Sequence, residues 1–276
     1  MLIILKMKQF AESKDPVEIL FKSEIEPRFP NYSKFWEQFI GFREDHLPKL
    51  LPYGLTFPEN YDKDKKQKIA DAYSKILESN YHLFRSLANV HFDVRDYLSN
   101  YKVPGPKCYF IRSKAFDSFY LNLGICRDMV SNLVESILIE ICGEAISKSK
   151  ECNVCHKKNK STLDEFYEYL KQSNQQFAED FKNWKSRVGK IRSRLNHINP
   201  IGKQVYPTGE EFITREFYRG TLGDDWNKMR SDNKIEIREV LENDLEKTEK
   251  LLNLLYTFFS GKLKDGLSKE KIVITY

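Results

Sequence analysis

Apolar residues recur along this chain at steps of three and four, which is the spacing of one face of an α-helix. The longest run with this spacing falls between Ser113 and Ser147. Its apolar positions are Phe116, Phe119, Leu123, Cys126, Val130, Leu133, Ile137 and Ile141. The pattern predicts a long amphipathic helix that buries one stripe against other helices.

Two further segments have the same period. The first spans residues 65–98, with apolar positions at Ile69, Tyr73, Ile76, Phe84, Leu87, Val94 and Leu98. The second lies near the C-terminus, with apolar positions at Ile237, Leu241, Leu245, Leu252, Leu255 and Phe259. Acidic residues stand between the apolar positions of this second segment, and we expect them on its outer face: Glu236, Glu239, Glu242, Asp244, Glu246 and Glu249.

Shorter helices are expected between the long ones. Thr162 followed by Glu165 forms a capping box, so a helix should begin at residues 161–162 and break near residues 173–174. A further helix is expected over residues 177–198. It should stop before Pro200, because the residue that precedes a proline disfavours the α region.

These segments predict an all-α helical bundle. Pro104-Gly105-Pro106 is the clearest boundary in the sequence. It divides an N-terminal helical extension, residues 1–105, from a bundle domain, residues 106–276. The stretches MLIIL at the start and KIVITY at the end are strand-like, and they are candidates to pair with each other.

Composition narrows the class of protein. The 276 residues include 41% hydrophobic ones, enough for a sizeable core, and only 12 glycines and 10 prolines, which disfavours a β-sandwich or barrel. Five cysteines at irregular spacing do not make a secreted disulfide framework. The sequence has neither an uninterrupted apolar run of about 18 residues nor a signal-peptide cleavage site. We therefore expect a cytoplasmic protein with no membrane partner.

Positive charge is concentrated in one segment, although the net charge of the chain is only +5. Residues 182–203 contain no acidic side chain and seven basic ones: Lys182, Lys185, Arg187, Lys190, Arg192, Arg194 and Lys203. Such a cluster creates a local field that attracts phosphate. A solvated helix face is the simpler interpretation of a charge run, but the polar residues at the end of this helix favour phosphate binding.

Those polar residues are the types that metal-free RNA cleavage needs. Arg192 and His197 stand five residues apart, about 140° around a helix and about 7.5 Å along it, so they flank a groove. A histidine can accept the proton of a ribose 2′-OH near neutral pH, and a guanidinium can stabilise the charge that builds on the phosphate oxygens. Asn196 lies one turn after Arg192 on nearly the same face and can orient the phosphate or the imidazole.

The pattern Arg192-x4-His197 at the end of a long helix resembles the motif of the HEPN superfamily. These are helical-bundle proteins, many of them metal-independent endoribonucleases of toxin–antitoxin and phage-defence systems. The resemblance covers roughly residues 108–262. The family usually has Asn, Asp or His directly after the arginine, where this chain has the shorter Ser193.

The resemblance implies a homodimer in which the two motifs form one composite site, RNA as the substrate, no cofactor, and an antitoxin or regulatory protein as a possible partner. Arg192 and His197 would then be catalytic, with Asn196 and Ser193 supporting orientation. The RNA backbone would be held by Lys185, Arg187, Lys190 and Arg194.

Two alternatives stay open. Arg and His at a helix end often cap carbonyls or form ion pairs, so the chain is alternatively a non-catalytic module that binds nucleic acid or protein. Cys152-x2-Cys155-His156 supplies at most three zinc ligands, and a symmetry partner would have to complete the set. A polar connecting loop with incidental thiols is the favoured interpretation of this segment, with no metal bound.

Overall fold

The computed structural model of this chain describes residues 54–146, 161–196, 203–205, 211–214 and 234–275. Their helices are α4 (Lys63–Ser99), α5 (Pro106–Leu133), the π-helix η2 (Val134–Ile141), α6 (Thr162–Ser173), α7 (Gln175–Asn196) and α9 (Ile237–Lys269). Their strands are β1 (Gly54–Thr56), β2 (Lys203–Val205), β3 (Glu211–Thr214), β4 (Lys234–Glu236) and β5 (Val273–Thr275). Helices dominate this part of the chain, so the prediction of an all-α fold is confirmed.

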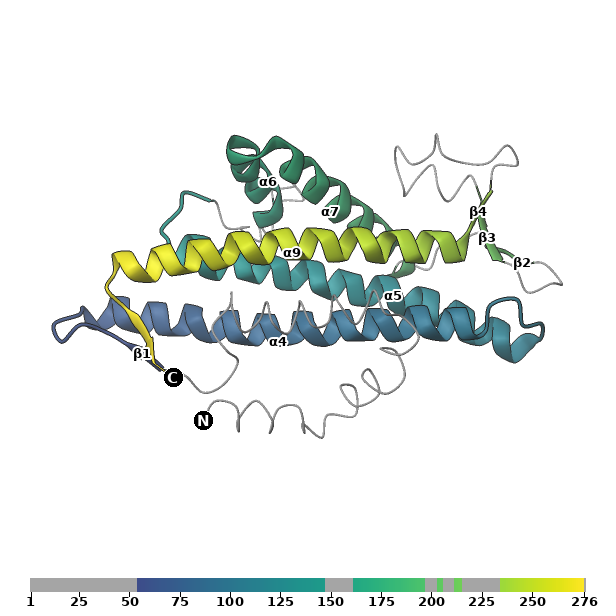
Figure 1. Cartoon of the computed structure of the whole chain (residues 1–276), viewed down its shortest axis with the longest axis horizontal. Coiled ribbons are helices and arrows are strands. Elements are labelled where there is room, and N and C mark those ends of the chain that lie inside the picture. Colours follow the sequence, from purple (N-terminus) through teal and green to yellow (C-terminus); the bar gives the residue numbers. More distant parts are fainter. Residues whose placement is uncertain (1–53, 147–160, 197–202, 206–210, 215–233, 276) are drawn as a thin grey trace, which may run out of the picture.

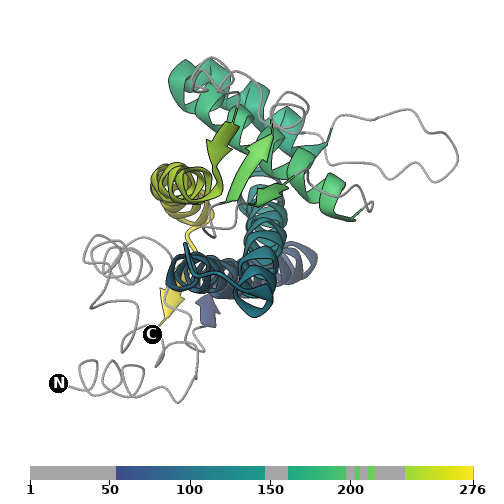
Figure 2. The ribbon, with the colours of Figure 1, turned by 90° about the vertical axis from the view of Figure 1, so that its right-hand side faces the viewer.

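Three long helices form the body of the molecule. Helices α4, α5 and α9 run side by side along its length, and η2 continues α5 (Figure 1). Helices α6 and α7 pack against each other and lie across α5, η2 and α9, on the side away from α4 (Figures 1 and 2). A small antiparallel sheet, in the order β2-β3-β4, lies where α9 begins.

The predicted apolar stripes form one continuous core. Every apolar position predicted for residues 113–147 is buried, and so is every one predicted near the C-terminus. In α4, the predicted positions Ile69, Tyr73, Ile76, Leu87 and Val94 are buried, and Leu98 is partly buried. The helical period therefore located the core correctly.

The acidic face predicted for α9 needs one correction. Asp244 is not on the outer face, because its side chain is only 4% exposed and forms an ion pair with Arg187 of α7. Glu249 is also largely covered, and its carboxylate lies 3.2 Å from Nε2 of the buried His91. Part of the acidic series thus faces basic groups of neighbouring helices rather than solvent.

The capping box of α6 lies one residue earlier than predicted. Ser161 has extended backbone angles and is the N-cap, while Thr162 is already helical. The Ser161 hydroxyl accepts a hydrogen bond from the backbone N–H of Asp164, whose carboxylate accepts one from the backbone N–H of Ser161. Two overlapping Ser/Thr-x-x-Asp/Glu patterns stand here, and the backbone uses the first.

The long helix predicted over 113–147 begins and ends earlier. It starts at Pro106, which has no N–H and therefore suits a first helical position, and it widens into η2 at Val134. The helical path ends after Ile141, and Gly143 takes a positive φ of 67° that favours glycine.

The predicted boundary at residues 104–106 coincides with the turn between α4 and α5. These two helices pack closely along their length and share the same core. The buried guanidinium of Arg112 in α5 donates hydrogen bonds to the carbonyl oxygens of Asn100 and Val103, so it caps the end of α4. The described part of the predicted extension, residues 54–105, is therefore integrated into the bundle.

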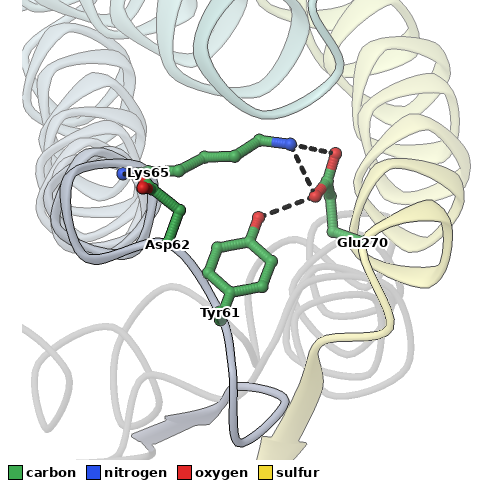
Figure 3. A network of polar contacts seen from close by, with 4 residues as sticks. All are labelled: Tyr61, Asp62, Lys65 and Glu270. Atoms are coloured by element: carbon green, nitrogen blue, oxygen red, sulfur yellow. Dashed lines mark hydrogen bonds and ion pairs between the residues drawn. The ribbon is translucent and has the colours of Figure 1, made fainter.

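The two ends of the described chain are joined. β5, within the strand-like KIVITY, pairs antiparallel with β1, whereas its predicted partner MLIIL lies outside the described residues. Beside this ladder, Tyr61 donates a 2.7 Å hydrogen bond to Glu270, and Lys65 donates to both oxygens of the same carboxylate (Figure 3). Burial, followed by the hydrogen bond to Glu270, raises the pKa of Tyr61 to about 12.

Candidate functional site

Helix α7, which carries the basic cluster, contacts α5 through two glycines. Gly124 of α5 lies against the side chain of Arg192, and Gly189 of α7 lies against the side chain of Arg127. Each helix thus contributes the pattern Gly-x-x-Arg, Gly124 to Arg127 and Gly189 to Arg192. Because the first glycine of one helix meets the arginine of the other, the two helices run in opposite directions at this contact.

Arg192, the predicted catalytic arginine, is held in a defined position. A Cβ on Gly124 would collide with Cδ of Arg192 and lie 2.9 Å from its Nε, so the glycine makes room for this side chain. Nη1 donates hydrogen bonds to the carbonyl oxygen of Gly124 at 3.3 Å and to the carboxylate of Asp128 at 2.5 Å. The side chain remains 31% exposed.

Arg127 occupies the corresponding place on the other side of the contact. A Cβ on Gly189 would lie 2.6 Å from its Nη1. Its Nε is buried and has no hydrogen-bond partner, and within the described ranges no carboxylate forms an ion pair with this guanidinium. Among the described residues, the charge of Arg127 therefore has no compensating carboxylate, unlike that of Arg192.

An open groove of about 510 Å³ lies beside this contact, between α5, α6 and α7. Most of its lining residues lie on successive turns of α7. The others are Arg127 of α5 and two residues at the start of α6. Its lining residues are Arg127, Ser161, Asp164, Lys185, Ser186, Gly189, Lys190 and Ser193. Three basic side chains and three hydroxyls against one carboxylate make this a surface suited to an anion.

One of the three basic groups is already compensated. Lys185 donates to Asp164 in a close ion pair, and its own side chain is only 13% exposed. Burial alone would raise the pKa of Asp164, but hydrogen bonds from Lys185 and Ser161 outweigh it and lower this pKa to about 2. Asp164 thus stays ionised above that pH, which leaves Arg127 and Lys190 as the basic groove residues that no described carboxylate compensates.

Arg187, predicted to hold RNA, points elsewhere. Its guanidinium lies 2.6 Å from the buried carboxylate of Asp244, which also accepts a 2.7 Å hydrogen bond from Tyr120. Trp184, one turn before it, is only 7% exposed and donates to the hydroxyl of Thr248. Both side chains belong to the contact between α7 and α9, so neither is available to a ligand in this arrangement.

Some of the other predicted site residues line the groove, and the side chains of the rest are not described. Lys185, Lys190 and Ser193 line the groove. Arg194 and Asn196 lie in the last turn of α7, where the structure describes the backbone only. The remaining candidates lie outside the described residues: His197, Cys152, Cys155 and His156. Within the part that is described, no group of His, Cys, Asp and Glu side chains is arranged to hold a metal.

Sequence reasoning missed Arg127 and Asp128. Both stand inside an amphipathic helix whose predicted role is core formation, and the charge run that drew attention lies on another helix. The available signal is the repeated Gly-x-x-Arg, since a glycine inside a helix costs about 1 kcal/mol relative to alanine and thereby points to a close approach.

None of the described helices combines the length and the apolarity that a membrane crossing requires. Comparison with known proteins finds no family model, curated protein or solved structure that matches this chain significantly.

Proposed function

We propose that this chain is a metal-independent endoribonuclease whose active site is formed by Arg192 and His197 of two copies of the chain. The observation that carries the proposal is the setting of Arg192: a partly exposed side chain, fixed by Gly124 and Asp128, next to a basic groove. His197 is the fourth residue after Ser193, the last residue of α7 that lines the groove. The resemblance of the motif to HEPN nucleases supports the same assignment.

The chemistry follows from these side chains. His197 accepts the proton of a ribose 2′-OH, whose oxygen then attacks the adjacent phosphorus. The bond from phosphorus to the 5′-oxygen breaks, and that oxygen takes a proton from a histidine in its acidic form. The products are a 2′,3′-cyclic phosphate and a 5′-hydroxyl, with no net change of oxidation state.

Arg192 has the features that stabilise charge on the pentacoordinate phosphorus. Donors fixed before the reaction act most strongly because they need no reorganisation when charge develops. Gly124 and Asp128 engage Nη1 alone, and the other guanidinium nitrogens make no hydrogen bond to a described residue. Asp128 accordingly orients Arg192 while its remaining donors stay available to phosphate.

A face of α5 suits the second copy that a composite site requires. Phe110, Leu121 and Ile125 are 67%, 39% and 37% exposed; Leu121 and Ile125 lie one turn apart, just before Asp128, and Phe110 lies about three turns earlier on the same side of α5. An apolar stripe that ends beside the Arg192–Asp128 pair would bring two such pairs near a shared two-fold axis. We define these three residues as the α5 stripe.

The experiment is RNA cleavage in EDTA. Wild type, Arg192→Ala and His197→Ala are each incubated with mixed cellular RNA, and the ends of the products are identified. Cleavage by wild type alone, leaving 2′,3′-cyclic phosphate ends, is the expected result. Cleavage that either variant retains at the wild-type rate contradicts the assignment.

Mixing the two inactive variants tests whether the site is composite. In a mixed dimer, the composite site keeps Arg192 from the His197→Ala copy and His197 from the Arg192→Ala copy, whereas a dimer of either variant alone lacks one of the two residues in both copies. We expect cleavage to return when Arg192→Ala and His197→Ala are mixed. If each site were built within one chain, the mixture would stay inactive.

The Arg192–Asp128 ion pair favours a second candidate, a non-catalytic module that binds nucleic acid or protein. A guanidinium held by a carboxylate has a structural role without any substrate. RNA that wild type binds and leaves intact in the same assay would support this module over the nuclease.

A further inference from the structure

The groove between α5, α6 and α7 has the charge of a phosphate site. Lys185 and Asp164 compensate each other, which leaves Arg127 and Lys190 as two basic residues with no described carboxylate as partner. The hydroxyls of Ser186 and Ser193 also make no hydrogen bond to a described residue and line the same groove. Two positive charges with free hydroxyl donors match a phosphate group in number and type.

The position of Arg127 is fixed by backbone rather than by a carboxylate. Its guanidinium rests on Gly189, where any side chain would lie in the way, and its Nε is buried in the helix contact. Leaving a charged side chain unpaired at such a site is unfavourable unless an anion arrives. The two terminal nitrogens form the planar fork that binds two phosphate oxygens at once.

The first turn of α6 forms the opposite wall. Its N-cap, Ser161, lines the groove, and the N-terminus of a helix carries partial positive charge. This contribution adds to the basic side chains but would not make a site alone. The volume of about 510 Å³ admits a nucleotide and is open enough for a strand to continue out of it.

We propose that this groove is a phosphate-binding subsite, with Arg127 and Lys190 as its ligands, that holds the backbone of a single RNA strand next to Arg192. The groove-lining residues of α7 lead from Lys185 through Gly189 to Ser193, which directly follows Arg192. A phosphate bound at Arg127 would lie across the glycine contact from Arg192. The assignment of RNA as the ligand rests on the proposed function. The assignment of a phosphate-binding groove does not.

Binding is measured with a fluorescent RNA whose riboses carry 2′-O-methyl groups, so that attack by the 2′-oxygen is blocked. Arg127→Met should weaken binding about ten-fold at moderate salt and reduce the salt dependence by about one phosphate contact. Lys190→Met should act in the same direction with a smaller effect. Arg85→Met is the matched control, since Arg85 is exposed on α4 and far along the sequence from the groove, and it should bind like wild type.

Gly189→Ala tests the position of the Arg127 guanidinium without removing its charge. The added Cβ would displace the end of Arg127, which is flexible, so the helix should form while the net charge stays unchanged. We expect RNA binding to fall about as much as in Arg127→Met, with thermal stability retained. Unchanged binding by both Gly189→Ala and Arg127→Met would overturn the subsite.

Binding of adenosine 5′-monophosphate and of inorganic phosphate shows whether the groove binds a free phosphate compound or an RNA strand. Calorimetric binding of either compound that Arg127→Met abolishes, with no effect on RNA, assigns the groove to a free phosphate compound instead of a strand. Failure of RNA and both small compounds to bind overturns the phosphate site altogether. Wild-type protein that binds the uncleavable RNA through Arg127 but cleaves no RNA would instead refute the nuclease and leave the subsite in place.

Discussion

At the residue scale, Asp244 is a buried charged group that links α9 to α7 and α5. It is buried on α9, and Arg187 and Tyr120 reach it from two other helices. Burial raises the pKa of Asp244, while the charge of Arg187 acts in the opposite direction. Removal of the cation alone leaves a buried carboxylate without compensation, which is more costly than removal of the whole pair.

We therefore expect Arg187→Ala to lower the free energy of unfolding by about 3–5 kcal/mol. Urea denaturation at pH 7 measures this change. Arg85→Ala, which removes an exposed arginine of α4, should change the stability by less than about 0.5 kcal/mol. Equal effects of the two substitutions would show that the Arg187–Asp244 pair does not stabilise the fold.

Asp93 makes stability depend on pH. Burial between α4 and α5 raises the pKa of this carboxyl to about 7, although Asn122 and Ser118 lower it. In the unfolded chain the group titrates near pH 4, so between about pH 4 and 7 the folded state binds one proton more. The protonated Asp93 carboxyl therefore makes its full contribution to the free energy of unfolding below pH 4. This contribution is lost as the pH rises to 7.

Asp93→Asn should remove this loss. We expect the variant to be more stable than wild type at pH 8, by on the order of 2–4 kcal/mol, and similar to it near pH 4. Denaturation curves at both values measure the difference. Asp96→Asn, at the half-exposed neighbour, should show no comparable gain, and a pH-independent difference for Asp93→Asn would refute the explanation.

At the same scale, residue type did not determine the role of each arginine. Arg187 and Arg192 belong to one charge run, yet Arg187 is largely buried against Asp244 and Arg192 is partly exposed beside Asp128. Their environments depend on where α9 and α5 cross α7, which a single sequence does not specify. Arg127 escaped prediction for the same reason, because its importance comes from the glycine of another helix.

At the scale of elements, two glycines of α9 show how local space decides the effect of a side chain. Gly261 is exposed, and a Cβ there would meet nothing within 4 Å. Gly266 is buried, and a Cβ would lie 3.0 Å from both Sγ of Cys142 and a methyl carbon of Ile141. The two positions share a helix and differ only in what faces them.

Gly261→Ala should stabilise the protein by about 0.5–1 kcal/mol through helix propensity alone. Gly266→Ala gains the same propensity but must push η2 away, so we expect a net loss of about 1–3 kcal/mol. Thermal unfolding of the two variants measures whether each is more or less stable than wild type. A gain in both variants would mean that the end of η2 yields easily.

Helices were predictable from their period, and so was the break after Ser173, but other helix ends were not. The apolar stripes of α5 and α9 are buried as expected because burial depends on a pattern repeated over many turns. The start of α6 depends instead on one local capping box, and the sequence offers that pattern at both Ser161 and Thr162. The change from α-helix to π-helix at Val134 was not visible in the hydrophobic spacing, because the apolar positions predicted for an α-helix there are also buried in η2.

At the scale of the whole molecule, the α5 stripe makes the proposed dimer testable. Leu121→Glu and Ile125→Lys place charge at its centre without touching the core. Light scattering should report a dimer for wild type and a monomer for the double variant, which should also have lost RNA cleavage. A double variant that remains dimeric would place the interface elsewhere, and Leu254→Glu, at an exposed position of α9, serves as the control.

The joined ends of the described fold also determine its response to force. Gly54 faces Thr275 in the β1–β5 ladder, so a pull applied at these two residues acts across the rungs rather than along the strands. Rungs loaded in this way break one after another, as a zipper opens, and each break needs little force. The load then passes to Glu270, whose bonds to Tyr61 and Lys65 hold the ends of α4 and α9 together. Under tension the bundle would therefore open progressively from its joined ends, while the contact between α5 and α7 stays unloaded until α4 and α9 have separated.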